Sequence, residues 1–231
     1  MRLDQFIAKH TEYSQQTARL LIAAGRVQIN QQTARDGQQN IDRFTTVQLD
    51  DRLLQQQTAL YFMLYKPGGY LSATRDPVHT TVTELFTEPL RQHLHIAGRL
   101  DRSTTGLLVL TNDGLWSRRL TEPGRRIPKV YLVSTAEPIA EHAAAYFERG
   151  IHLAREGVDT SPAQLQLLSP CQARLTIHEG RHHQVKRMFH AVGNRVVALH
   201  RESMGDITLD TSLVPGEYRP LSAPEVDSVR R

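Results

Sequence analysis

The segment from residue 98 to residue 114 carries the sharpest chemical signal in the sequence. It reads Gly-Arg-Leu-Asp, a short polar stretch, and then Thr-Gly-Leu-Leu-Val-Leu-Thr-Asn-Asp-Gly. Asp101 therefore stands in a polar loop shortly before residues 107–110, an apolar run with the length of a buried strand. Because such a strand holds a neighbouring loop rigidly, the carboxylate of Asp101 is a candidate for nucleophilic attack or proton transfer.

A second chemical pattern, at residues 178–182, reads His-Glu-Gly-Arg-His and satisfies the H-E-x-x-H signature of zinc proteases. That signature works only on a continuous helix, which brings both histidines to one face. Here Leu175 and Ile177 alternate with polar residues and predict a strand, and Gly180 predicts a turn. The longer HExxHxxGxxH pattern is also lacking. The sequence therefore predicts no metal site.

The first 57 residues have the pattern of a small helical module. Two apolar helix faces, a serine cap, a stop glycine and two short alternating strands define it. The first helix face holds Leu3, Phe6 and Ile7, and the second holds Ala18, Leu21 and Ile22. Ser14 is the cap of the second helix and Gly25 is the stop. One strand contains Val27 and Ile29, and the other contains Val47 and Leu49. The polar, unpatterned Gln run at residues 55–57 marks the predicted domain boundary. We therefore expect one domain at 1–57 and a second at 58–231.

The second domain mixes strands and helices. Strands are predicted at residues 61–65, 107–110, 130–133, 174–177 and 196–199. Helices are predicted to begin near Gly114 and Pro138, and a third spans residues 181–192. That third helix carries one apolar face, formed by Val185, Met188, Phe189 and Val192. This order of elements predicts an α+β fold with a mostly antiparallel sheet.

The positive charge of the chain is concentrated in two windows. Residues 118–129 hold five Lys/Arg and one acid, and residues 174–201 hold six Lys/Arg and one acid. These windows sum to +9, and since the whole chain is +4, the remainder is −5. Such clustering is typical of a surface that binds a polyanion, although two solvated faces would give the same count.

Composition also limits the compartment. Cys171 is the single cysteine, so an internal disulfide is excluded and a reducing cytoplasm is favoured. No stretch approaches the ~20 apolar residues of a membrane span, so no membrane partner is expected. The first ten residues include an acid at position four and no apolar run, which does not fit a secretion signal.

Four motifs together resemble the RsuA-type branch of the pseudouridine synthases. The mark of that branch is GRLD followed by GLL-x-LT-x-DG, as at residues 98–114. Residues 61–70 resemble the strand and KP-x-GY turn that opens its catalytic domain, and residues 129–131 resemble its K-x-Y motif. Residues 179–188, Glu-Gly-Arg-His-His-Gln-Val-Lys-Arg-Met, resemble the motif whose basic residue pairs with the aspartate. The resemblance covers nearly the whole chain, because residues 1–57 look like an S4 RNA-binding domain.

The resemblance implies an isomerase that converts one uridine of ribosomal RNA into pseudouridine, without metal or cofactor. Asp101 would attack C1′ of the ribose or assist proton removal from C2′, and these two routes stay open. Lys186 would pair with Asp101 and favour its ionised form. Tyr131 would stack on the flipped uracil, and its phenol would serve in proton transfer at C5. RNA contacts are expected from basic side chains in both domains: Arg19, Arg26, Arg43, Arg99, Arg102, Arg181 and Arg187.

Each of these residues also has a plainer interpretation. Asp101 could cap a turn or pair with Arg99 or Arg102, Tyr131 could be a core residue of an alternating strand, and Lys186 could be surface charge on a helix. A rival protein class is a non-catalytic S4-domain ribosome-assembly factor. Glycosidases and metal nucleases fit less well, because they need paired or multiple carboxylates and the motifs supply one clear acid.

Overall similarity points to small-subunit (16S) ribosomal RNA, or a small-subunit assembly particle, as the partner. A related synthase acting on 23S ribosomal RNA is the alternative, since such enzymes share nearly all these motifs. We expect a cytoplasmic monomer.

Overall fold

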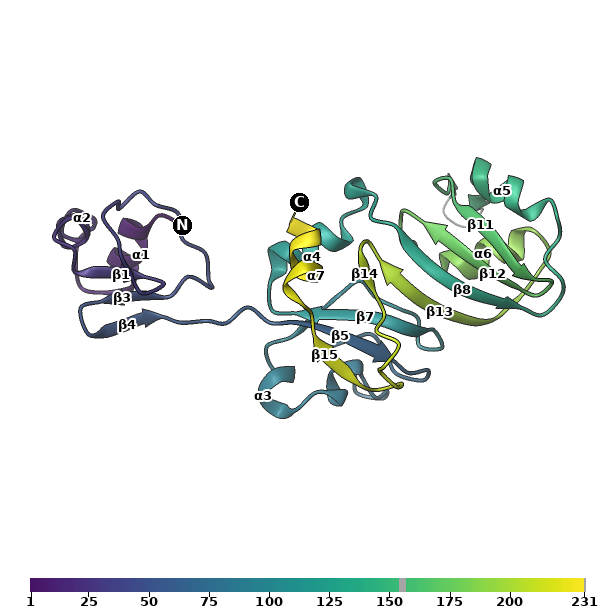
Figure 1. The fold of residues 1–231 in the computed structure, drawn as a ribbon, viewed down its shortest axis with the longest axis horizontal. Coiled ribbons are helices and arrows are strands. Elements are labelled where there is room, and N and C mark those ends of the chain that lie inside the picture. The colour runs from purple at the N-terminus through teal and green to yellow at the C-terminus, as the bar shows by residue number, and fades with distance from the viewer. Residues whose placement is uncertain (154–156, 231) are drawn as a thin grey trace. The chain divides into compact units, whose positions relative to one another are not determined.

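The computed structural model describes residues 1–153 and 157–230, which form two compact units, Met1–Ala59 and Leu60–Arg231 (Figure 1). Each unit has its own hydrophobic core.

The first unit packs two helices on a small antiparallel sheet. Its elements are α1 (Leu3–His10), α2 (Gln15–Ala23), β1 (Val27–Ile29), β2 (Gln32–Thr33), β3 (Val47–Leu49) and β4 (Arg52–Gln55), with strand order β2-β1-β3-β4. The predicted apolar helix faces are buried in its core. Ser14 accepts a hydrogen bond from the Thr17 amide and so caps α2, as predicted. Gly25, with φ of 78°, follows the helix in the left-handed conformation that glycine adopts without steric cost.

The second unit is built on a nine-stranded sheet in which the strands run in the order β11-β12-β8-β13-β7-β5-β15, with β14 beside β13 and β6 beside β7. The strand pairs are antiparallel except β13 with β7, which is parallel. This confirms the predicted α+β class with a mostly antiparallel sheet. The strands of this sheet are β5 (Tyr61–Lys66), β6 (His95–Ala97), β7 (Thr105–Thr111), β8 (Lys129–Thr135), β11 (Gln164–Ser169), β12 (Gln172–Ile177), β13 (Val196–Met204), β14 (Ile207–Thr208) and β15 (Tyr218–Pro220). Outside this sheet, β9 (His152–Leu153) pairs with β10 (Val158–Asp159).

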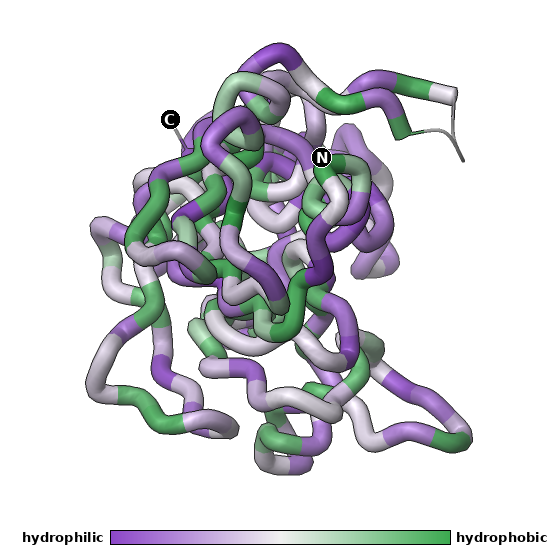
Figure 2. The backbone as a smooth tube through the Cα atoms, turned by 90° about the vertical axis from the view of Figure 1, so that its right-hand side faces the viewer, coloured by the Kyte–Doolittle hydropathy of each residue, from purple (hydrophilic) through white to green (hydrophobic). Residues whose placement is uncertain are grey.

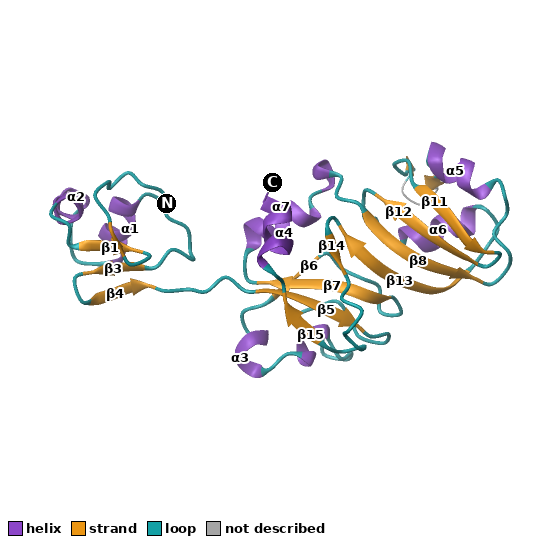
Figure 3. Cartoon of the chain, viewed as in Figure 1, coloured by secondary structure: helices purple, strands orange, loops and turns teal. Residues whose placement is uncertain are grey.

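Helices cover both faces of this sheet (Figure 3). They are η1 (Val82–Leu85), α3 (Glu88–Arg91), α4 (Gly114–Thr121), η2 (Pro123–Arg125), α5 (Ala143–Arg149), α6 (Gln184–Ala191) and α7 (Ala223–Arg230). Alternate residues of β7 face opposite cores, as the period of two in a strand requires. Leu108 and Leu110 pack in the core with α5 and α6, whereas Leu107 and Val109 pack in the core with α4 and α7.

Two predicted helix starts were wrong. The helix expected near Pro138 begins at Ala143, because the chain after Pro138 is tied to the β11–β12 turn by a hydrogen bond from the Ile139 amide to the Pro170 carbonyl. The helix expected from Arg181 begins at Gln184, because His183 has a φ of 51° that no α-helical residue adopts.

Figure 2 shows hydrophobic and hydrophilic residues interleaved along the backbone. None of the helices in the described ranges is long and apolar enough to cross a membrane.

The parallel pairing of β7 with β13 depends on Gly106, which lies opposite Arg201. Gly106 has φ of 103°, and a Cβ there would lie 2.4 Å from the Arg201 carbonyl oxygen. We expect Gly106→Ala to lower the free energy of unfolding by roughly 2–5 kcal/mol, from the disfavoured φ and the backbone clash together. Urea denaturation measures this loss. The control is Gly114→Ala, where a Cβ meets nothing within 4 Å. Equal stability changes for the two variants would contradict the prediction.

Candidate active site

Asp101 lies in the loop between β6 and β7, and the main chain of this loop is held by buried polar side chains. Ser72 donates to the Leu100 carbonyl oxygen at 2.7 Å and accepts from the Leu100 amide at 3.1 Å. Arg201, which is only 1% exposed, donates through Nη2 to the Gly98 carbonyl oxygen at 3.2 Å. These bonds fix the backbone just before Asp101.

Lys66 holds the other end of the loop. This fully buried side chain donates through Nζ to the carbonyl oxygens of Pro67 at 2.9 Å, Arg102 at 3.1 Å and Thr104 at 2.8 Å. Burial lowers the pKa of Lys66 to about 8, while the charge of Asp101 raises it and that of Arg201 lowers it. The three carbonyl acceptors replace the water that the buried ammonium has lost.

The carboxylate of Asp101 is contacted on both oxygens. Lys186 Nζ, on helix α6, lies 3.3 Å from Oδ2 and also donates to Ser103 Oγ at 3.0 Å. His183 Nε2 lies 3.5 Å from Oδ1. The side chain of Asp101 is 23% exposed, so it remains open to a bound molecule. The predicted pair of Asp101 and Lys186 is therefore within ion-pair distance.

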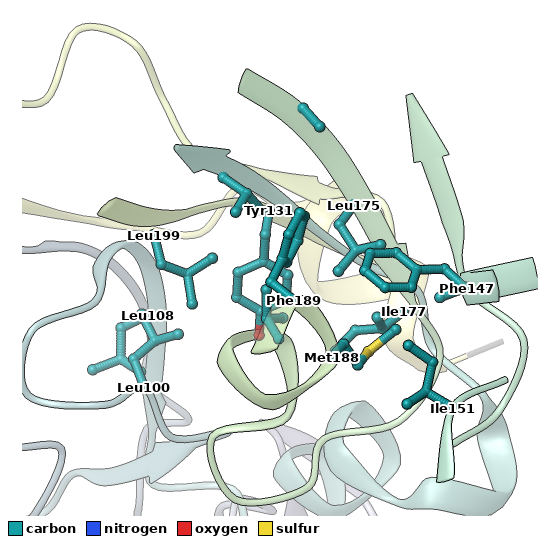
Figure 4. Packing of buried hydrophobic residues seen from close by; sticks show 14 of the residues in the cluster. Leu100, Leu108, Tyr131, Phe147, Ile151, Leu175, Ile177, Met188, Phe189 and Leu199 are labelled. Carbon is teal, nitrogen blue, oxygen red and sulfur yellow. The ribbon is translucent and has the colours of Figure 1, made fainter. Parts of the chain in front are cut away.

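Tyr131 lies on β8, where buried and half-buried residues alternate. Its ring packs in the hydrophobic core near Phe189 and Leu199, as Figure 4 shows, and only 7% of the residue is exposed. Even so, Tyr131 lines the same cavity as Asp101. Tyr131 is therefore a core residue whose ring also forms part of the cavity wall.

The cavity has a volume of about 570 Å³ and an uneven distribution of charge. Its wall includes Asp101, Tyr131, His183, Glu179, Lys129 and Arg201. A space of this size is within the range of small-molecule sites, and two acids, Asp101 and Glu179, stand among several basic groups in it. The arrangement suits a polyanionic ligand with one group presented to Asp101.

Three of the predicted RNA-binding arginines, Arg99, Arg102 and Arg181, line this cavity and are exposed. Arg102 donates to the Gly69 carbonyl oxygen at 2.9 Å, and Arg181 pairs with Glu179 at 3.2 Å. Arg187 is half-buried on α6. Their positions are compatible with RNA contacts, which stay a prediction.

The other three predicted arginines lie in the first unit and are exposed. Arg19 pairs with the buried carboxylate of Asp4 at 2.8 Å, and Arg26 pairs with Asp50. Arg43 donates to Gln57 Oε1 at 3.1 Å. Each guanidinium thus has an acceptor within the protein. An RNA phosphate would have to displace that acceptor or share the guanidinium with it.

The H-E-x-x-H segment does not lie on a helix. His178 directly follows β12, His182 stands in the following turn, and α6 begins only at Gln184. Within the described ranges, no group of three or more His, Cys, Asp or Glu side chains is placed to hold a metal ion. The shared helix face that the zinc signature requires is therefore not formed.

Sequence reasoning did not assign a role to Ser72, Lys66, Arg201 or His183. Arg201 did leave a signal, since it lies in β13 two residues after the buried Leu199 and so occupies an inward position. A charged residue at an inward strand position has to be paired with polar groups. The others gave no pattern, because their partners are main-chain atoms or residues distant in sequence.

Comparison with known proteins identifies the family. The RNA pseudouridylate synthase family model matches residues 60–191, and the S4 domain model matches residues 1–47. The chain belongs to the RNA pseudouridylate synthase family. A pseudouridylate synthase relative, ribosomal small subunit pseudouridine synthase A of Pseudomonas aeruginosa, is 54% identical over 99% of this chain and 100% of its own. The protein of that name from Escherichia coli K12 is 48% identical over 99% and 100%.

A solved pseudouridylate synthase structure agrees with this assignment of the synthase family. That crystal structure superposes with a TM-score of 0.73 and 43% identity, covering 99% of each chain. The resemblance inferred from the GRLD segment is therefore confirmed, and so is the S4 domain at the start of the chain.

The burial of Lys129, two residues before Tyr131, is expected to make the free energy of unfolding depend on pH. Burial lowers the pKa of Lys129 to about 8, and the Arg201 charge lowers it further against an opposing effect of Glu179. Between pH 8 and the ordinary lysine value of 10.5, the unfolded chain binds a proton that the folded protein has lost, so rising pH favours folding. Relative to Lys129→Met, the wild type should gain up to about 3 kcal/mol of unfolding free energy over this range. Urea unfolding at several pH values measures the difference, and parallel curves would contradict it.

Proposed function

We propose that this protein isomerises a specific uridine of small-subunit (16S) ribosomal RNA to pseudouridine, with Asp101 as the catalytic carboxylate. The observation that carries the proposal is the position of Asp101, 3.3 Å from Lys186 and in one cavity with Tyr131. The relatives described above are named ribosomal small subunit pseudouridine synthase A, and their matches cover 99% of this chain.

The reaction exchanges one glycosidic bond for another. The bond from C1′ to N1 breaks, the uracil rotates, and a bond from C1′ to C5 forms, after which C5 loses its hydrogen and N1 carries a proton. Asp101 either attacks C1′ or removes a proton from C2′, and an ionised carboxylate beside the ribose serves both routes. Lys186 pairs with that carboxylate at 3.3 Å.

Tyr131 is proposed to stack on the uracil during this rotation. Its ring already forms part of the cavity wall, so a flipped base gains an aromatic face without further rearrangement of the core. Flipping costs a few kcal/mol, which stacking against such a ring offsets in part. The Tyr131 phenol is proposed to serve in the proton transfer at C5.

RNA next to the flipped uridine is proposed to follow the rim formed by α4 and η2. Arg118, Arg119 and Arg126 are exposed there, and Thr121 and Pro123 of the same segment line the cavity. Phosphate groups are attracted to such a rim by charge, whatever the base sequence.

The domain at 1–57 is proposed to dock on structured ribosomal RNA and the domain at 58–231 to carry out the isomerisation. A cytoplasmic monomer acting on 16S RNA or on a small-subunit assembly particle fits the single cysteine and the names of the relatives.

Asp101→Asn should abolish the reaction while leaving the fold intact. The amide keeps the shape of the side chain but neither attacks C1′ nor accepts a proton, so the rate should fall by at least about a thousandfold. The measurement is tritium release from RNA labelled at C5 of uridine, with chelator present, since the proposed chemistry uses no metal. Asp227→Asn, on the exposed face of α7, is the matched control. Release that persists in Asp101→Asn would exclude this carboxylate as the catalytic group, and no release by the wild type would favour the assembly-factor interpretation.

The substrate is identified by mapping pseudouridines in a strain that lacks this protein. Carbodiimide treatment followed by reverse transcription should show one stop missing from 16S ribosomal RNA, restored by the wild-type gene and not by the gene carrying Asp101→Asn. A stop missing from 23S ribosomal RNA instead would contradict the proposed substrate and support the related-synthase alternative.

A further inference from the structure

His183 occupies a position whose local structure does not suit a histidine. It is the residue that precedes helix α6, yet its side chain makes no capping hydrogen bond to the helix. Serine, threonine, aspartate and asparagine are preferred there because they do cap. His183 also has φ of 51°, in the left-handed region that residues with a Cβ rarely adopt.

The side chain of His183 is directed instead to Asp101. Nε2 lies 3.5 Å from Oδ1, while Lys186 contacts Oδ2, so the two carboxylate oxygens have separate partners. The ring of His182 stacks on that of His183, with 3.8 Å between ring centroids and 22° between planes. This stack restricts rotation of the imidazole. Backbone positions that break local preference in this way concentrate at functional sites.

We infer that His183 is a positioning residue for Asp101, a role that rests on the proposed function of that carboxylate. The imidazole holds Oδ1 while Lys186 holds Oδ2, and together they fix the plane of the carboxylate relative to the ribose. A carboxylate held in one orientation reacts faster than one that rotates freely.

Several other charged and titratable groups lie around the cavity wall to which His183 belongs. They are Asp101 and Arg102 on the loop, Lys186 on α6, and Glu179, Arg181 and His182 on the segment that precedes the helix. Arg181 is paired with Glu179, so these two charges largely cancel. Variants that test His183 therefore have to leave Asp101 and Lys186 unchanged.

The test uses two variants that suit the left-handed backbone, His183→Gly and His183→Asn. Because neither introduces new strain, the melting temperature should be unchanged or higher. The rate constant kcat for tritium release at pH 7 should fall about tenfold, because Oδ1 of Asp101 loses the partner that orients it, with KM unchanged.

Asp227→Asn, on the exposed face of α7, is the control, and it should leave kcat unchanged. An unchanged kcat in both His183 variants, with an active wild type, would overturn the inference and leave the proposed function intact. A rise in KM at constant kcat would also overturn it, because His183 would then bind RNA. An inactive wild type would overturn the proposed function itself, and with it the inference.

Discussion

The carboxylate proposed to act at C1′ has to keep its place, and positive charge around the loop that carries Asp101 meets this requirement. Lys186 lies 3.3 Å from the carboxylate itself. Lys66 and Arg201 do not contact the carboxylate; they bind carbonyl oxygens on either side of it. These hydrogen bonds hold the loop, and its side-chain acid remains open to the cavity.

Burying two cations beneath one loop is costly unless every donor finds an acceptor. Main-chain carbonyl oxygens are suitable acceptors, because they accept hydrogen bonds without neutralising the cation. Lys66 and Arg201 therefore keep a positive field beneath Asp101 while they fix its backbone. The lowered pKa of Lys66 shows that the burial is not fully compensated. The stability of the unit and the reactivity of its acid thus depend on the same hydrogen bonds.

Much of the fold could be predicted because its signals are local. The apolar run at residues 107–110 and the alternation around Tyr131 mark strands β7 and β8, and the serine cap marks α2. The start of α6 could not be predicted in this way. Residues 181–184 contain no glycine or proline that would mark a later helix start, and nothing local reveals that His183 turns left-handed toward Asp101.

The site itself was predictable only in part, for the same reason. Asp101 and Lys186 stood out through their motifs, and the structure brings them within 3.3 Å. The contributions of Ser72 and Arg201 depend on contacts between segments far apart in the chain, namely Ser72 with Leu100 and Arg201 with Gly98. Such contacts leave no periodic pattern in a single sequence.

The parallel pairing of β7 with β13 has a consequence for synthesis of the protein on the ribosome. His200 pairs with Thr105, so roughly half of the catalytic unit must be translated between the two partners. Long-range parallel pairing is slow to form, whereas the first unit consists of local contacts within 59 residues. A nascent chain can therefore fold its first unit well before Arg201 emerges. Until then the loop of Asp101 lacks the hydrogen bond from Arg201 to the Gly98 carbonyl oxygen.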